Sequence, residues 1–199
     1  MVLRVLLLPF IVLTGFGFAE EKNHGMGIVL VAVGHVDKRI LEELREDLSK
    51  SFNKKVFVGK EILEPDYALN KTRDQYFSTA ILNSLAKQEE YSAFERVLGI
   101  VDHDLYVPEL NFVFGEASHR VAVISLSRLR QEFYGLPRES SLFHRRVVTE
   151  AFHELGHTYG LGHCQNPRCV MFFSNSLMDT DRKDTEFCQG CRSQLQGEE

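Results

Sequence analysis

The sequence contains no tryptophan, only five prolines among 199 residues, and no cysteine before residue 164. The absence of cysteine over most of the chain excludes a fold whose overall structure is held together by disulfides. Its 14 glycines and five prolines are too few for a collagen or a low-complexity chain. Basic residues are also in slight deficit, since 23 lysines and arginines face 28 aspartates and glutamates, for a net charge of −5. Nucleic-acid binding is therefore not expected, because it requires a basic surface.

Long hydrophobic runs are absent except near the N-terminus. The apolar stretch at residues 5–18 is interrupted by proline and glycine, and is too short to be a regular membrane-spanning helix. Arg4 precedes it, and Gly17 and Ala19 are small residues suited to a cleavage site. Residues 1–19 therefore predict a cleaved signal peptide, with an uncleaved anchor as the alternative. We expect an exported protein, periplasmic or extracellular, with no membrane contact after cleavage.

The first half of the chain alternates between strand and helix patterns, which predicts a mainly parallel α/β sheet with right-handed crossovers. A continuous apolar run such as Gly27–Val33 is typical of a strand buried on both faces. The predicted elements are a strand at Gly27–Val33, a helix from Asp37 to about Phe52, a strand at Val56–Val58, a second helix opened by a capping box at Thr72–Gln75, and a strand at Val97–Val101.

The pattern changes after residue 101. Strands at Asn111–Phe114 and Arg120–Leu126 are separated by a hairpin-length segment, which predicts an antiparallel edge strand. A long helix follows from Ser140 or Ser141 to about Gly160. We expect one compact α/β (α+β) domain at residues 25–163, a short C-terminal appendix at 164–191, and a tail at 192–199.

The clearest motif is His-Glu-Leu-Gly-His-Thr-Tyr-Gly-Leu-Gly-His at residues 153–163. His153 and His157 project from one face of a helix, and Gly160 allows the chain to turn so that His163 reaches the same point. Three neutral imidazoles leave one tetrahedral position open, which is typical of a catalytic zinc site. The alternative is a set of ordinary surface histidines. A chain of this composition contains the full pattern by chance on the order of once in 10,000 sequences.

Two acidic residues accompany this motif. Glu154 lies about 100° around the helix from His153, beside the open metal position, and is expected to act as the general base toward a zinc-bound water. Glu150 lies one turn earlier, where it is a candidate for orienting an imidazole.

All four cysteines lie in the appendix, and their spacing forms two pairs. Cys164 and Cys169 are separated by four residues, and Cys188 and Cys191 by two. Two close pairs about 18 residues apart are typical of a structural four-thiolate zinc site. Two disulfides in an exported protein are the competing interpretation.

Together these residues resemble the archaemetzincins. The resemblance rests on the histidine motif, on Cys164 directly after His163, on Cys169-Val-Met171 and on the later cysteine pair. It implies a zincin-like (metzincin) fold and a zinc metallopeptidase with two zinc ions, one catalytic and one structural. It also implies that Met171 is the Met-turn residue beneath the three histidines. Members of that family are expected to be cytoplasmic, which is the alternative to export.

The resemblance further implies that Asn111–Ala117 is the upper edge strand of the cleft, where an extended peptide can pair by β-augmentation. Asp102, Asp104 and Glu116 flank this strand and are candidates for holding a substrate's amino terminus, as in an aminopeptidase. Solvated loop acids are the alternative.

The sequence thus predicts a monomeric zinc metallopeptidase that acts on peptides or proteins. The first alternative is a peptide-binding protein that keeps the metals but has little or no turnover. The second is a zinc-storage or purely structural protein.

Overall fold

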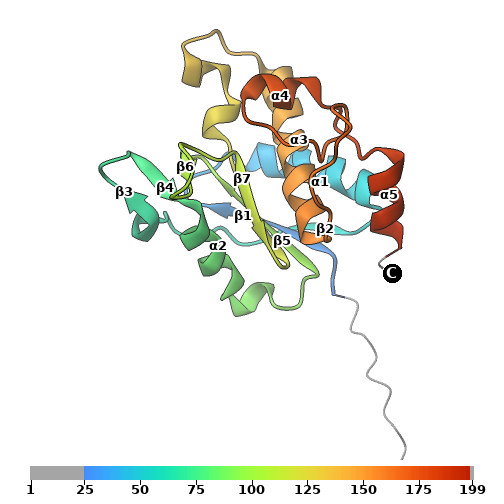
Figure 1. Ribbon diagram of the computed structural model, residues 1–199. Coiled ribbons are helices and arrows are strands. Elements are labelled where there is room, and N and C mark those ends of the chain that lie inside the picture. The colour runs from blue at the N-terminus through green and yellow to red at the C-terminus, as the bar shows by residue number, and fades with distance from the viewer. Residues whose placement is uncertain (1–24, 198–199) are drawn as a thin grey trace, which may run out of the picture.

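The computed structural model describes residues 25–197 of the 199-residue chain. Figure 1 shows a central sheet with helices packed on it and the C-terminal helices gathered at one side. The predicted signal peptide lies outside the described residues, so it stays a prediction. Within residues 25–197 no helix combines the length and hydrophobicity needed to cross a membrane.

The sheet has five strands in the order β2-β1-β5-β8-β7. Four of them run parallel, and β7 pairs antiparallel with β8 at one edge. This confirms the predicted mixed, mainly parallel sheet with an antiparallel edge strand. The strands are β1 (Ile28–Val33), β2 (Val56–Val58), β5 (Arg96–Val101), β7 (Gly115–Ser118) and β8 (Val121–Ser125).

A small second sheet lies beside the first. It consists of β3 (Leu69–Asn70), β4 (Gln75–Phe77) and β6 (Leu105–Tyr106), in the order β3-β4-β6. The helices are α1 (Lys38–Phe52), α2 (Ser78–Ala86), α3 (Ser140–Thr158), α4 (Leu177–Arg182) and α5 (Gln189–Gln196).

Two hydrophobic clusters fill the two faces of the main sheet. Alternate residues of β1 enter opposite clusters: Ile28 and Leu30 pack with α1 and α3, whereas Val29 and Val31 pack with α2. All six residues of β1 are buried, so the prediction of a strand covered on both faces is confirmed. The result is a three-layer domain in which α3 lies on the sheet close to edge strand β7.

The predicted capping box at Thr72–Gln75 is wrong. These residues form a turn followed by β4, and α2 begins only at Ser78. The Asn70 side chain accepts hydrogen bonds from the backbone N–H groups of Thr72 and Arg73, which favours the turn. The Gln75 side chain donates to Asp104 instead of returning to residue 72.

The predicted edge hairpin is correct in kind but shifted in sequence. The second strand is confirmed as β8, whereas the first begins at Gly115 and not at Asn111. The hairpin turns at His119, which has a left-handed backbone with φ of 53°. The apolar residues expected to form the strand pack by their side chains instead, and Phe112 and Phe114 contact each other with ring centroids 5.2 Å apart.

Candidate active site and metal centres

Helix α3 carries the first two histidines of the motif. The carboxylate of Glu139 caps its start by accepting hydrogen bonds from the N–H groups of Ser141 and Leu142. The helix ends at Thr158, and Gly160 follows with φ of 79°, a left-handed conformation that favours glycine. The chain therefore turns back toward the helix, as predicted.

The imidazoles of His153 and His157 are oriented by backbone carbonyls. His153 Nδ1 lies 2.8 Å from the Val170 carbonyl oxygen, and His157 Nδ1 lies 2.7 Å from that of Leu161. A carbonyl only accepts, so each Nδ1 carries the proton and each Nε2 presents a lone pair. The two Nε2 atoms are 3.2 Å apart. Because neither atom carries a proton, two lone pairs face each other at this distance. A cation bound between them would offset their repulsion.

His163 completes this cluster after the glycine turn. Its ring contacts the Phe173 ring at a tilt of 53°, with centroids 4.8 Å apart, and lies almost parallel to the His153 ring. One nitrogen from each of the three histidines lies within 4.8 Å of the others. Tetrahedral zinc with bonds of about 2.0–2.1 Å separates its nitrogen ligands by about 3.3 Å, so the donor set fits that ion.

Desolvation favours the neutral form of these imidazoles. Burial lowers the pKa of His153 to about 2 and also lowers the pKa values of His157 and His163, with desolvation as the main cause in each case. The neutral form is the one that binds a metal.

Glu154 is buried beside the histidines on the same helix. Burial raises its pKa well above the usual value, and the neighbouring carboxylates of Glu150 and Glu116 add to the shift, while Lys183 opposes it. Gly115 of β7 packs directly against its side chain. A carboxyl group that favours holding a proton is suited to accepting one during a reaction.

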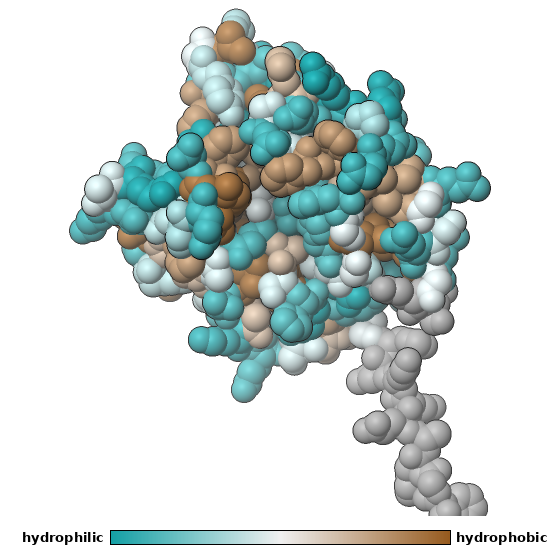
Figure 2. Space-filling view, viewed as in Figure 1, coloured by the Kyte–Doolittle hydropathy of each residue, from teal (hydrophilic) through white to brown (hydrophobic). Residues whose placement is uncertain are grey.

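The histidines and Glu154 line a cleft of about 420 Å³. One wall comes from residues 110–117, including edge strand β7, and the other from residues 173–175. Leu110 and Phe173, on opposite walls, are both about half exposed. Figure 2 shows hydrophobic surface over β6 and near α4 on the face that carries β7. The cleft therefore has apolar side chains at Leu110 and Phe173, and the histidines and Glu154 form part of its lining.

Met171 packs against α3, and its role as the Met-turn residue stays a prediction. Its side chain is fully buried, and a Cβ on Gly156 of α3 would collide with its sulfur. The glycine in the motif thus lets the helix pack closely on Met171.

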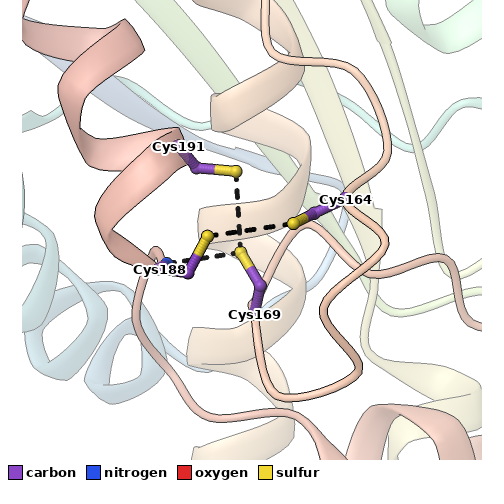
Figure 3. A group of neighbouring side chains, drawn as sticks. All are labelled: Cys164, Cys169, Cys188 and Cys191. Carbon is purple, nitrogen blue, oxygen red and sulfur yellow. Dashed lines mark hydrogen bonds between the residues drawn. The ribbon is translucent and has the colours of Figure 1, made fainter.

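The side chains of the four cysteines, from the loop after α3 and from the start of α5, point toward one another (Figure 3). The Sγ atoms of Cys164 and Cys188 are 3.8 Å apart, and those of Cys169 and Cys191 are 3.7 Å apart. All four are free, so the two-disulfide alternative does not describe this structure. Tetrahedral zinc with Zn–S bonds of about 2.3 Å separates its sulfurs by about 3.8 Å, so this donor set fits zinc as well. Residues 25–197 thus hold two clusters suited to a metal ion.

The two clusters share their supporting backbone. Cys164 directly follows His163, and its N–H donates to the Met171 carbonyl. Cys169 directly precedes Val170, whose carbonyl orients His153. The spacing of the cysteines and histidines predicted both clusters. It did not predict these main-chain carbonyl contacts, because a residue of any type can supply a carbonyl.

The other acidic candidates are engaged in different contacts from those predicted. Glu150 accepts a hydrogen bond from Thr180 and lies 3.8 Å from Lys183 Nζ; within residues 25–197 it is hydrogen-bonded to no imidazole. The side chains of Lys183 and Glu150 are both nearly inaccessible to solvent. Lys183 was missed at the sequence level because a lysine is seldom fully buried.

The three acids near the edge strand are not free loop groups. Asp102 pairs with Arg130, and Asp104 pairs with Arg128 at 2.5 Å. Glu116 accepts hydrogen bonds from the hydroxyls of Ser78 and Thr79 at the start of α2. Of the three, Glu116 lines the cleft.

The chain combines a mixed sheet, a helix bearing two histidines one turn apart, and a third histidine after a glycine turn. A buried methionine packs against that helix. This combination is that of the metzincin class of metallopeptidases. The model of peptidase family M54 matches residues 31–197. The chain belongs to this family, that of the archaemetzincins.

Named relatives are similar over nearly their whole length. Archaemetzincin of Methanocaldococcus jannaschii is 45% identical over 173 residues, covering 86% of this chain and 93% of that protein. The crystal structure of archaemetzincin from Methanopyrus kandleri has a TM-score of 0.77 at 39% identity, covering 90% of this chain and 97% of that one. A zinc-dependent peptidase from Methanocorpusculum labreanum has a TM-score of 0.76 at 33% identity, covering 85% and 100%.

Proposed function

We propose that this chain is a zinc-dependent peptidase in which His153, His157 and His163 hold the catalytic zinc and Glu154 is the general base. The observation that carries the proposal is the convergence of two unprotonated Nε2 atoms 3.2 Å apart, with the buried Glu154 carboxyl on the same helix. A zinc ion held by the three histidines would supply Lewis-acid chemistry, lowering the pKa of a water molecule and polarising the substrate carbonyl. Glu154 takes the water's proton and passes it to the leaving amine.

We further propose that Cys164, Cys169, Cys188 and Cys191 hold a structural zinc. The paired Sγ separations of 3.8 and 3.7 Å support four-thiolate coordination. The role of this ion is to fix the segment that carries His163 and the Val170 carbonyl.

The substrate is a peptide bound in an extended conformation along β7. This strand pairs with β8 on one side only, so its other edge is open to the cleft. A peptide added at this edge gains backbone hydrogen bonds without regard to its sequence.

A preference for free amino termini is the finer part of the proposal, and Glu116 is the residue that supports it. Its carboxylate lines the cleft and is held by hydroxyl groups, and within residues 25–197 no lysine or arginine forms an ion pair with it. Comparing hydrolysis of one peptide with a free and with an acetylated amino terminus tests this preference. Equal rates contradict it.

Replacing Glu154 by Gln tests the mechanism. We expect kcat to fall by about 10²–10⁴-fold, the usual contribution of a general base, while metal content stays at two zinc ions per chain. Glu132→Gln, a change at an exposed carboxylate distant in sequence, is the control and should keep full activity. Retained activity in the Glu154 variant removes that residue from the mechanism.

The alternative of a peptide-binding protein with little turnover makes a different prediction. Screening a peptide library for new termini, with and without a chelator, separates the two. Products that disappear with chelator support a peptidase, whereas binding without chelator-sensitive products supports the alternative.

A further inference from the structure

The edge strand that borders the cleft contains one residue that contacts the proposed general base. Gly115 is the first residue of β7, and it faces Glu154 of α3. Two properties of Gly115 bear on the active site: the direction of its backbone N–H and C=O groups, and the space left by the absence of a side chain.

The backbone of Gly115 faces the open edge of the sheet. The Phe114 carbonyl accepts a hydrogen bond from Ser125 N at 2.8 Å, and the register pairs Gly115 with Ile124. Residues of an antiparallel ladder alternate between hydrogen-bonded and non-hydrogen-bonded pairs. Gly115 is therefore in a non-hydrogen-bonded pair, and its N–H and C=O point away from β8, where a substrate strand would bind.

The missing side chain of Gly115 leaves room for the catalytic carboxyl. A Cβ at this position would lie 2.6 Å from Glu154 Cγ and 2.8 Å from its Oε1. Neither distance is compatible with van der Waals contact. Glycine is not required here by the backbone, because the left-handed glycines among the described residues are at positions 27, 34, 135 and 160. The remaining reason for a glycine at position 115 is the space that it leaves for the Glu154 side chain.

The Glu154 side chain has little freedom to move away. It is only 6% exposed, and its neighbours on α3 are packed on the sheet. A methyl group at residue 115 must therefore displace either β7 or the carboxyl group. Either change alters the position of Glu154 relative to a peptide bound on that strand.

We infer that Gly115 is a positioning residue, which sets the distance between the Glu154 carboxyl and the substrate backbone. The inference rests on the function proposed above. A misplacement of about 1 Å in an active site can cost about 10²-fold in rate. Alanine keeps the same backbone N–H and C=O, so substrate binding should change little.

Gly115→Ala tests the inference on the metal-loaded protein, with a fluorogenic peptide as substrate. We expect kcat to fall by about 100-fold, KM to change by less than about threefold, and zinc content to stay equal to that of the wild type. Gly197→Ala is the matched control: it makes the same substitution after α5, where the added Cβ would make only ordinary van der Waals contacts, and should keep activity within about threefold.

The possible outcomes separate the two claims. No chelator-sensitive hydrolysis by the wild type overturns the proposed function itself. With an active wild type, an unchanged kcat in Gly115→Ala overturns the positioning role. Loss of zinc, loss of folding, or a rise in KM that accounts for the whole effect also overturns it, because each of these indicates a structural or binding role.

Discussion

The pair formed by Lys183 and Glu150 gives the sharpest test of how the C-terminal segment is attached to α3. The Lys183 side chain is 0% exposed and that of Glu150 is 3% exposed, with 3.8 Å between Nζ and Oε1. Nζ also donates to the Phe172 carbonyl at 3.2 Å, next to Met171. Replacing Lys183 by Met keeps most of the volume but leaves the buried carboxylate without its cation.

The expected loss of stability follows from this geometry. Coulomb's law gives about 4 kcal/mol for two unit charges 3.8 Å apart at an effective dielectric constant of about 20. Removing one partner of a buried pair typically costs about 3–5 kcal/mol, which agrees with that figure. For a chain of this size, such a loss lowers the midpoint of thermal unfolding by about 6–20 °C. Burial already raises the pKa of Glu150, and the neighbouring lysine counteracts the shift.

Thermal and urea unfolding at equal, saturating zinc measure this loss. The double variant Lys183→Met with Glu150→Gln removes both charges and should recover most of the stability. The matched control is Lys38→Met: Lys38 is also 3.8 Å from its partner, Glu61, but both side chains are largely exposed, so the midpoint should not shift measurably. A loss below about 1 kcal/mol for Lys183→Met, or a double variant no more stable than the single one, refutes the reasoning.

Two further predictions concern the cysteine cluster and the carboxyl end of the sheet. Cys191→Ser should reduce the zinc content from two ions per chain to one and lower activity at least about tenfold, because the cysteine cluster supports His163. Metal analysis together with activity assays checks this prediction. Full activity with one zinc ion per chain contradicts it. The pKa of Glu64 is lowered, chiefly by its hydrogen bond with His103. It therefore stabilises the fold above about pH 4.5, and this contribution is lost as pH falls through the folded-state pKa. Glu64→Gln should flatten the decline of the free energy of unfolding between about pH 5 and 3. The effect should be less than about 1 kcal/mol, because Glu64 is 43% exposed, and an unchanged decline contradicts the prediction.

The sequence predicted the parts of the fold that depend on local patterns. The apolar run of β1, the helix before the histidine motif and the cysteine pairs each have a spacing that few other structures satisfy. Their positions in the structure agree with these predictions because burial on both faces, helical periodicity and metal-ligand spacing are all encoded by residues close in sequence.

The errors and omissions involve contacts between residues distant in sequence. The segment at Thr72–Gln75 matched a capping box, but Gln75 bonds to Asp104, 29 residues away. The orientation of His153 depends on a main-chain carbonyl 17 residues later. The space at Gly115 and the buried ammonium of Lys183 likewise become visible only when α3 packs on its neighbours.

The direct adjacency of His163 and Cys164 limits how the length of this segment can vary. No spacer separates the two clusters on that side, and a single residue, Val170, separates Cys169 from Met171 on the other. A residue inserted or deleted at the first junction would displace a histidine and a cysteine together, and one at the second would displace Cys169 together with the Val170 carbonyl that orients His153. Evolution and engineering can lengthen the exposed loop at residues 165–168 or the stretch before Cys188, whereas the two junctions must keep their length for either metal to be bound.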